Sequence, residues 1–248
     1  MLRFCKPCIK HDPGHFLRLS ALPGFFQMSG FSTARQKMVD GQVRPSDVTD
    51  NRIIDAMLTV PREVFVPPSQ RPLAYLDLDL DVSEGGPVKR FLIKPAATAK
   101  MVQAAEIKDT DEVLVAGCAS GYMAALVAKL ARRVMATEPD ATLAAEASSI
   151  CAEIGLGNVT AKAAAVAEGD SANAPFDVII LNGATEIAPE GLYRQLKEGG
   201  RLVGAFAMTR QQRVTIVTRS HDDFGIRPLF DAALPVLPGL ERPPAFVF

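Results

Sequence analysis

The segment VLVAGCASGYMAALVAKLA, residues 113–131, decides the fold of this chain. Residues 112–117 form a short apolar run that leads into the glycine-containing turn 117–121, and residues 120–130 are small and aliphatic, as in a buried helix. A glycine in such a turn lets the backbone approach a ligand, and the amides at the start of the helix face the same pocket. The segment therefore predicts a strand, a tight turn and a helix, with a binding site at the turn.

Strand-like and helix-like segments alternate around this unit. Further strands are expected at 133–138, 159–163, 176–181, 201–207 and 213–220, and helices at 47–60, 95–107, 142–154 and 189–196. Asp50 is available to cap the first helix, and Pro95 suits the first position of the second. Near-continuous apolar strands that alternate with helices indicate a parallel sheet covered on both faces. Such a sheet binds ligands beyond the carboxyl ends of its strands, where the strand order reverses.

Length and charge exclude several classes of protein. The 248 residues suit one large α/β domain, or a domain with a small appendage. With 27 basic and 28 acidic residues, the net charge of −1 argues against binding nucleic acid through bulk electrostatics. The longest uncharged stretches, 19–34 and 113–128, are too short to span a membrane. We therefore expect neither a nucleic-acid partner nor a membrane partner.

Residues 1–37 are expected to be a disordered basic extension outside the fold, because three prolines interrupt them and a lone acid opposes their basic residues. The extension contains Cys5, Cys8, His11 and His15, which could in principle bind zinc. Only two residues separate the two pairs, whereas a zinc finger places about a dozen or more there. We therefore predict no metal site, and reduced cysteines in a cytoplasmic protein.

A carboxylate stands at the spacing of a nucleoside site. Glu138 closes the second expected strand, twenty-one residues after Gly117, where a carboxylate can accept hydrogen bonds from both hydroxyls of a ribose. A dinucleotide fingerprint would need glycines at 117, 119 and 122, but the chain has Gly, Ala and Tyr there. That pattern disfavours a dinucleotide-dependent oxidoreductase. Two glycines four residues apart fit the shorter turn that binds S-adenosylmethionine (SAM). The candidate cofactor-binding residues are Gly117, Cys118, Ala119, Ser120, Gly121 and Glu138.

Residues 38–207 resemble the protein-L-isoaspartate O-methyltransferase family. The matching segments are 113–131, ATEPD (136–140), GLGNV (155–159), APFDVIILNGA (174–184) and QLKEGGRLV (195–203). The resemblance implies the Rossmann-like fold of SAM-dependent methyltransferases, with a seven-stranded, mostly parallel sheet and helices on both faces. It also implies methyl transfer from SAM to the α-carboxylate of isoaspartyl residues in damaged proteins, so the partner would be a protein or peptide substrate.

The resemblance also implies a division of the methyltransferase-like domain, residues 38–248. Residues 38–110 would form the N-terminal substrate side, 111–220 the SAM-binding core, and 221–248 a C-terminal tail. A carboxylate with a pKa near ~4 is already ionised at neutral pH and needs no general base. The enzyme's task is then to align the reactants and exclude water. The sequence identifies no catalytic residue. Arg90 and Lys94 are candidates for binding the substrate carboxylate, or are solvated residues beside a helix start.

The chain departs from the family pattern in four places. Val115 replaces the acid that opens the turn, and Ala119 replaces its central glycine, which is costly only if φ is positive there. Ala164-Ala165 replaces a Gly-Asp pair, and Ile93 replaces a serine. Each lost hydrogen bond from a charged group costs about 1.5–3 kcal/mol. These departures leave open an alternative, a catalytically silent protein of the same fold that binds a nucleoside or a partner protein.

Overall fold

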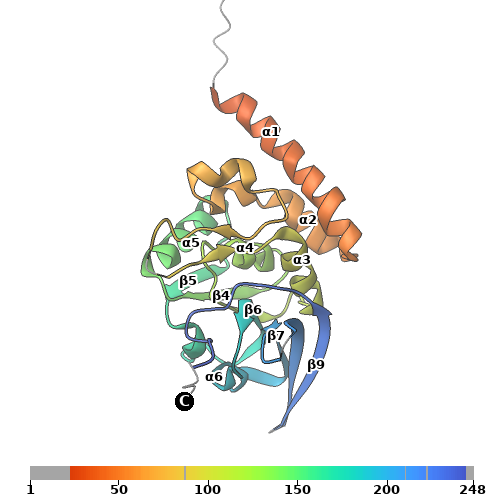
Figure 1. The fold of residues 1–248 in the computed structure, drawn as a ribbon, viewed down its shortest axis with the longest axis vertical. Helices are drawn as coiled ribbons and strands as arrows, with labels where there is room; N and C mark the ends of the chain where they lie inside the picture. Colours follow the sequence, from red (N-terminus) through yellow and green to blue (C-terminus); the bar gives the residue numbers. More distant parts are fainter. Residues whose placement is uncertain (1–22, 87, 210, 222, 244–248) are drawn as a thin grey trace, which may run out of the picture.

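The computed structural model describes residues 23–86, 88–209, 211–221 and 223–243, with side chains from residue 30 onward (Figure 1). Its centre is a seven-stranded sheet of order β5-β4-β3-β6-β7-β8-β9. The strands are β3 Glu112–Ala116, β4 Arg133–Glu138, β5 Val159–Ala163, β6 Phe176–Thr185, β7 Leu196–Phe206, β8 Arg213–Ser220 and β9 Asp223–Asp231. Strands β3 to β7 pair in parallel, whereas β8 and β9 are antiparallel. The predicted seven-stranded, mostly parallel sheet is confirmed.

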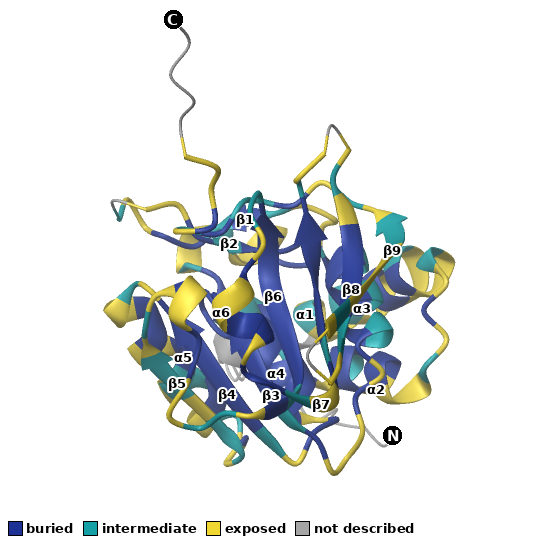
Figure 2. Ribbon diagram, turned by 90° about the horizontal axis from the view of Figure 1, so that it is seen from below, coloured by how far each residue is buried: buried dark blue, intermediate teal, exposed yellow. Residues whose placement is uncertain are grey.

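Helices cover both faces of the sheet, as Figures 1 and 2 show. The helices are α1 Pro23–Met38, α2 Asn51–Thr59, α3 Pro95–Ala104, α4 Tyr122–Ala128, α5 Ala141–Glu153 and α6 Glu190–Tyr193. Successive side chains of β3 point to opposite faces of the sheet. Val113 and Val115 belong to the hydrophobic cluster that includes residues of α2–α5. Leu114 and Ala116 belong to the cluster on the other face, which contains Leu192 of α6. Helix α6 is shorter than expected because β7 already begins at Leu196.

Apart from α2, the chain between α1 and α3 consists of short elements. It contains a π-helical turn (Val39–Val43), 3₁₀ turns (Arg44–Ser46, Arg62–Phe65 and Pro68–Leu73) and a two-stranded antiparallel ribbon, β1 Leu80–Asp81 with β2 Phe91–Leu92. A further 3₁₀ turn, Val166–Glu168, follows β5. Helix α2 begins as predicted, because the side chain of Asp50 accepts a hydrogen bond from the amide of Arg52 (2.9 Å).

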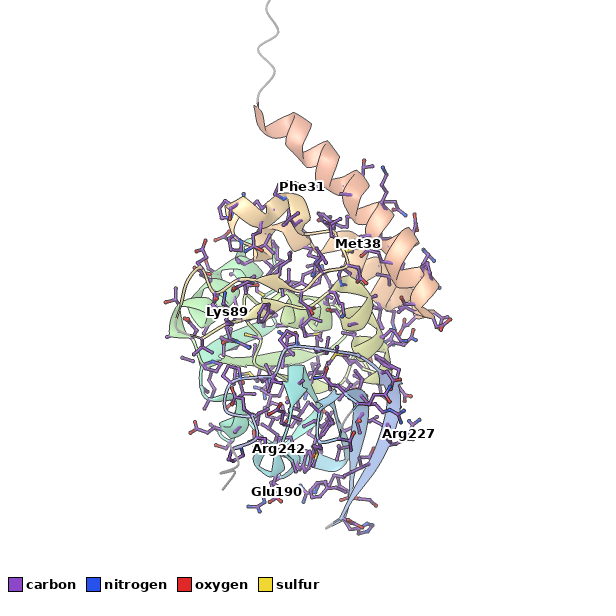
Figure 3. The ribbon with its side chains drawn as sticks, in the orientation of Figure 1. Phe31, Met38, Lys89, Glu190, Arg227 and Arg242 are labelled. Atoms are coloured by element: carbon purple, nitrogen blue, oxygen red, sulfur yellow. The ribbon has the colours of Figure 1, made fainter. Side chains whose placement is uncertain are left out.

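Helix α1 crosses the boundary that we expected after residue 37. The ring of Phe31 lies 6.3 Å from that of Tyr75, and Met38 is almost fully buried (Figure 3). Arg35 donates hydrogen bonds to Glu63 (3.1 Å) and to the phenolic oxygen of Tyr75 (3.0 Å). The basic composition suggested a solvated tail, because nothing local in the sequence pairs Arg35 with a carboxylate 28 residues away. The zinc candidates of residues 5–15 lie outside the described residues.

None of the described helices is long and apolar enough to cross a bilayer.

Arg35→Gln should lower the free energy of unfolding by about 1–3 kcal/mol, because Glu63 is then left partly buried without its cation. Arg44→Gln is the matched control: its partner Asp40 and Arg44 itself are about half exposed, so the change should stay below about 0.5 kcal/mol. Urea unfolding of both variants at pH 7 measures the difference. Equally small losses would show that α1 is not anchored through Arg35.

Candidate functional site

The turn Gly117–Gly121 connects β3 to α4 at the carboxyl edge of the sheet. From β3 the chain proceeds outward to β4 and β5 and then returns to β6 on the other side, so the strand order reverses beside this turn. The amides of Gly117 and Cys118 both donate to the carbonyl of Thr137 at the end of β4 (2.8 and 2.9 Å). The turn is thereby fixed next to Glu138, at the place where an open α/β sheet binds its ligands.

Glu138 is completely buried and fully hydrogen-bonded. Its Oε1 accepts from Arg90 Nε (2.7 Å) and from the amide of Asp140 (3.4 Å). Its Oε2 accepts from Arg90 Nη2 (2.9 Å) and from the amide of Ala119 (2.6 Å). A carboxylate offers about four lone-pair positions. All of them are therefore engaged, and no acceptor position remains for the hydroxyls of a ribose.

The space above Gly117 is also filled. Gly117 has φ +72°, and a β-carbon built there would lie 2.7 Å from Leu237 Cδ2, 3.0 Å from Arg90 Nη2 and 3.4 Å from Val166 Cγ2. Glycine at this position permits a close approach to the backbone, and the sequence predicted that a ligand would make it. The groups that make the approach belong to the chain itself.

Leu237 reaches this place on the segment that follows β9. The amide of Ala184, near the end of β6, donates to the carbonyl of Pro235 (2.8 Å), and the amide of Leu237 donates back to the carbonyl of Ala184 (2.8 Å). A parallel bridge between Ala184 and Val236 continues the sheet. The segment 234–240 therefore covers the carboxyl end of β6, beside the reversal of strand order.

The two other small residues of the turn have different roles. Gly121 has φ +98°, and a β-carbon there would lie 2.8 Å from Cβ of Ala147, so glycine lets α5 pack against the turn. Ala119 is fully buried with φ +50°, a left-handed conformation that strains a residue with a β-carbon. Alanine in place of the family's glycine therefore costs stability at this position.

Cys118 gives the site no nucleophile. Burial raises the pKa of its thiol, and the nearby carboxylate of Glu138 raises that pKa further. The thiol is therefore protonated at neutral pH, and protonated thiols are poor nucleophiles and poor metal ligands.

The two candidates for substrate binding contact different partners. Arg90, which is 3% exposed, points to Glu138 and also donates to the carbonyl of Gly117 (2.8 Å). The Lys94 ammonium donates to the carbonyl of Ala233 (3.2 Å). Ile93, which stands where the family has serine, is buried and its carbonyl accepts from Arg62 (2.7 Å). Arg90 and Lys94 therefore donate to different partners, and their roles toward a substrate stay predictions.

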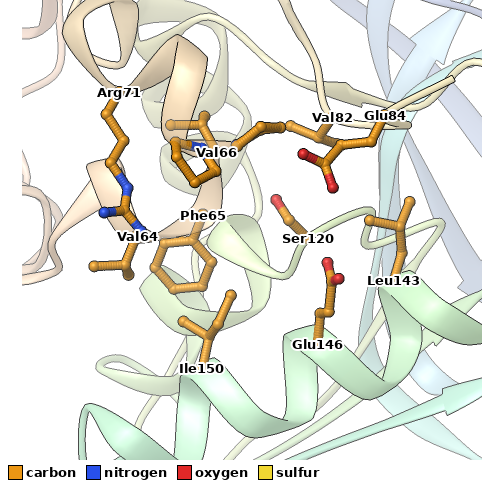
Figure 4. A pocket seen from close by; sticks show the side chains of 12 residues that line it. Val64, Phe65, Val66, Arg71, Val82, Glu84, Ser120, Leu143, Glu146 and Ile150 are labelled. Atoms are coloured by element: carbon orange, nitrogen blue, oxygen red, sulfur yellow. The ribbon is translucent and has the colours of Figure 1, made fainter.

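Ser120 faces a cavity that the sequence did not indicate (Figure 4). The cavity lies between α5 and the segments 64–71 and 82–84. Its lining combines apolar side chains with two carboxylates: Val64, Phe65, Val66, Pro67, Pro68, Arg71, Val82, Glu84, Ser120, Leu143, Glu146 and Ile150. The buried Ser120 hydroxyl has no hydrogen-bond partner among the described residues. The predicted nucleoside site, which we call the cradle, consists of the turn Gly117–Gly121 and Glu138, and of these residues Ser120 lines the cavity whereas Glu138 does not.

The arrangement of the cradle does not fit SAM in this conformation. An adenosine group would need acceptor positions on Glu138 and open space over Gly117. Arg90 takes the acceptor positions, and Leu237 and Val166 take the space. Among the described residues, no group of three or more His, Cys, Asp or Glu side chains is placed to hold a metal.

Ala119→Gly should stabilise the protein by up to about 1 kcal/mol, because glycine relieves the positive φ that alanine tolerates poorly. Ala124→Gly, in the buried helix α4, is the control and should destabilise by about 0.5–1 kcal/mol. Chemical denaturation of the two variants measures opposite signs. A loss of stability in both would contradict the left-handed conformation at residue 119.

Known proteins are similar to this chain in sequence and in fold. A model of the protein-L-isoaspartate(D-aspartate) O-methyltransferase family matches residues 33–231. A protein-L-isoaspartate O-methyltransferase of Koribacter versatilis is 36% identical over 192 residues, 77% of this chain and 85% of that protein. One from Geobacter metallireducens is 36% identical over 197 residues, 79% of this chain and 89% of that protein.

Two solved structures are similar to this chain in fold. A protein-L-isoaspartate O-methyltransferase superposes with a TM-score of 0.74 at 22% identity, covering 84% of this chain and 67% of that one. A Plasmodium falciparum protein described as a putative enzyme of this kind, solved with S-adenosyl-L-homocysteine, gives 0.69 at 18% identity, covering 84% and 97%. These likenesses support the fold, and the sequence match from residue 33 to residue 231 shows that the chain belongs to the protein-L-isoaspartate(D-aspartate) O-methyltransferase family.

Proposed function

We propose that this chain is a SAM-dependent O-methyltransferase that methylates the carboxylates of isoaspartyl residues in proteins or peptides. The match of the family over residues 33–231 is the observation that carries the proposal. The fold supports it, because the turn after β3 and the carboxylate that ends β4 lie together at the reversal of strand order. When bound, SAM would supply the methyl group on a positively charged sulfur.

The methyl acceptor, an isoaspartyl carboxylate, needs little activation by the protein. An isoaspartyl carboxylate is already ionised at neutral pH, so the chain needs no side chain to remove a proton. Its contribution is to bind the two reactants close together and to exclude water. The ribbon β1–β2 and the segment 234–240 lie beside the cradle and are the described elements placed to do this. Because Arg90 and Leu237 fill the cradle, both must move before an adenosine group can reach Glu138.

We further propose that the reaction serves the repair of damaged proteins and takes place in the cytoplasm. The free thiols of Cys118 and Cys151 support a reducing compartment. The balanced net charge supports a protein substrate over nucleic acid.

Transfer of a labelled methyl group from SAM to an isoaspartyl peptide tests the proposal. Wild type should methylate this peptide and leave the same peptide with normal aspartate unlabelled. Glu138→Gln should lower turnover about ten- to a hundredfold, the effect of losing one charged hydrogen-bond acceptor. Glu112→Gln, which alters a carboxylate paired with Arg132 at the opposite edge of the sheet, is the matched control and should keep wild-type turnover.

Two results would contradict this function. Wild type without turnover would favour the silent protein of the same fold, and unchanged turnover in Glu138→Gln would separate the activity from the cradle. Circular dichroism of each variant confirms that it is folded.

A further inference from the structure

We propose that Arg90 is an internal occupant of the cofactor site, which competes with the ribose of SAM for Glu138 and thereby sets the affinity of the chain for the cofactor. This inference rests on the proposed function and adds a residue that controls cofactor binding.

The guanidinium makes the contacts that two ribose hydroxyls would make. Its Nε and Nη2 donate to separate oxygens of Glu138, at 2.7 and 2.9 Å, in a two-point pairing of fixed geometry. A ribose presents its two adjacent hydroxyls to a carboxylate in the same two-point manner. Arg90 and the ribose therefore need the same two acceptors, and Glu138 cannot bind both.

Further hydrogen bonds hold the ion pair between Arg90 and Glu138 in place. Arg90 Nη2 also donates to the carbonyl of Gly117 (2.8 Å), which accepts a second bond from Asn182 (3.0 Å). Arg90 and Glu138 are 3% and 0% exposed. A buried charge is costly unless it is paired and hydrogen-bonded. The guanidinium thus belongs to the cradle's own bonding network and is not a surface side chain folded inward.

The backbone on both sides of Arg90 is anchored. The amide of Val82 donates to the carbonyl of Arg90 (2.8 Å), Asp81 pairs with Phe91 across the ribbon, and Lys89 forms an ion pair with Asp81. Burial acts to raise the pKa of Asp81, but its bonds from Lys89 and Ser83 outweigh burial and lower that pKa to about 2. Asp81 is therefore ionised at neutral pH and holds this strand end. We infer that the Arg90 side chain leaves Glu138 by rotating about its own bonds.

Competition of this kind has a simple thermodynamic consequence. When only a fraction of molecules has the binding-competent form, the measured affinity falls by that fraction. Removing the competitor should raise affinity as long as Glu138 remains to bind the ribose. A pair with a purely structural role would behave differently, since its removal would change stability without a gain in affinity.

Calorimetric titration with S-adenosylhomocysteine, the product of methyl transfer, tests the inference on the full chain. Arg90→Gln should bind it about tenfold or more tightly than wild type does. The double variant Arg90→Gln with Glu138→Gln should lose that gain. Arg201→Gln is the control: it breaks the pair with Asp111, whose side chains are 15% and 8% exposed, at the opposite end of the strands, and should bind as wild type does.

Thermal unfolding is a second measurement, which separates the effect of each substitution on stability from its effect on binding. Arg90→Gln leaves Glu138 buried without a cation, so its thermal midpoint should be lower than that of wild type and should rise more on addition of S-adenosylhomocysteine. Arg90→Lys keeps a cation but not the two-point pairing, and should give a smaller gain in affinity. That variant carries the test if Arg90→Gln does not fold.

Three results would overturn the inference: unchanged or weaker binding in the Arg90 variants, a gain that persists without Glu138, or no binding by any variant. Its failure can be told apart from failure of the proposed function. If the Arg90 variants bind more tightly but no protein methylates the peptide, the function fails and the inference stands. If wild type methylates but the Arg90 variants bind no more tightly, the inference fails and the function stands.

Discussion

The buried ion pair between Arg90 and Glu138 is the interaction on which the centre of this molecule depends. It joins the ribbon β1–β2 to the end of β4, and through Arg90 it also reaches the turn after β3. A carboxylate with no exposed surface is costly to bury unless it is paired and hydrogen-bonded, and Arg90 supplies that pairing. The ribbon β1–β2 and the sheet are therefore joined through the carboxylate that we propose as part of the cofactor site.

Around Gly117 the chain also fills the site with its own side chains, two of which are apolar. The left-handed glycine leaves a gap, and Leu237 and Val166 fill it from the segment after β9 and the turn after β5. A gap lined by apolar groups would cost stability if it were empty, because dense packing holds the interior together. Filling by the chain's own side chains stabilises the arrangement in which Leu237 and Val166 lie against Gly117. Opening therefore carries a cost that a bound adenosine would have to offset.

The sequence predicted the fold because the fold depends on local patterns. The apolar run before Gly117, the cap at Asp50 and the proline at 95 each act within a few residues. The position of Glu138 beside the turn followed from the regular length of a strand–helix–strand unit. The partner of Glu138 could not be predicted in this way, because Arg90 lies 48 residues earlier and no periodicity connects the two. Arg35 with Glu63 and Leu237 with Gly117 escaped prediction for the same reason.

The pairing of Glu138 with Arg90 changes the role that this carboxylate has in the molecule. A carboxylate at this spacing suggests a nucleoside, because a buried acid needs donors and a ribose provides them. In this chain Arg90 provides them, so Glu138 would be required for stability even without a cofactor. The residue at position 90 therefore carries information that the carboxylate does not. An uncharged side chain there would leave Glu138 in need of an external donor, whereas arginine satisfies it internally. Under the competition that we propose, the pair formed by Arg90 and Glu138 determines the cofactor affinity of this chain more directly than the glycine turn and the carboxylate alone.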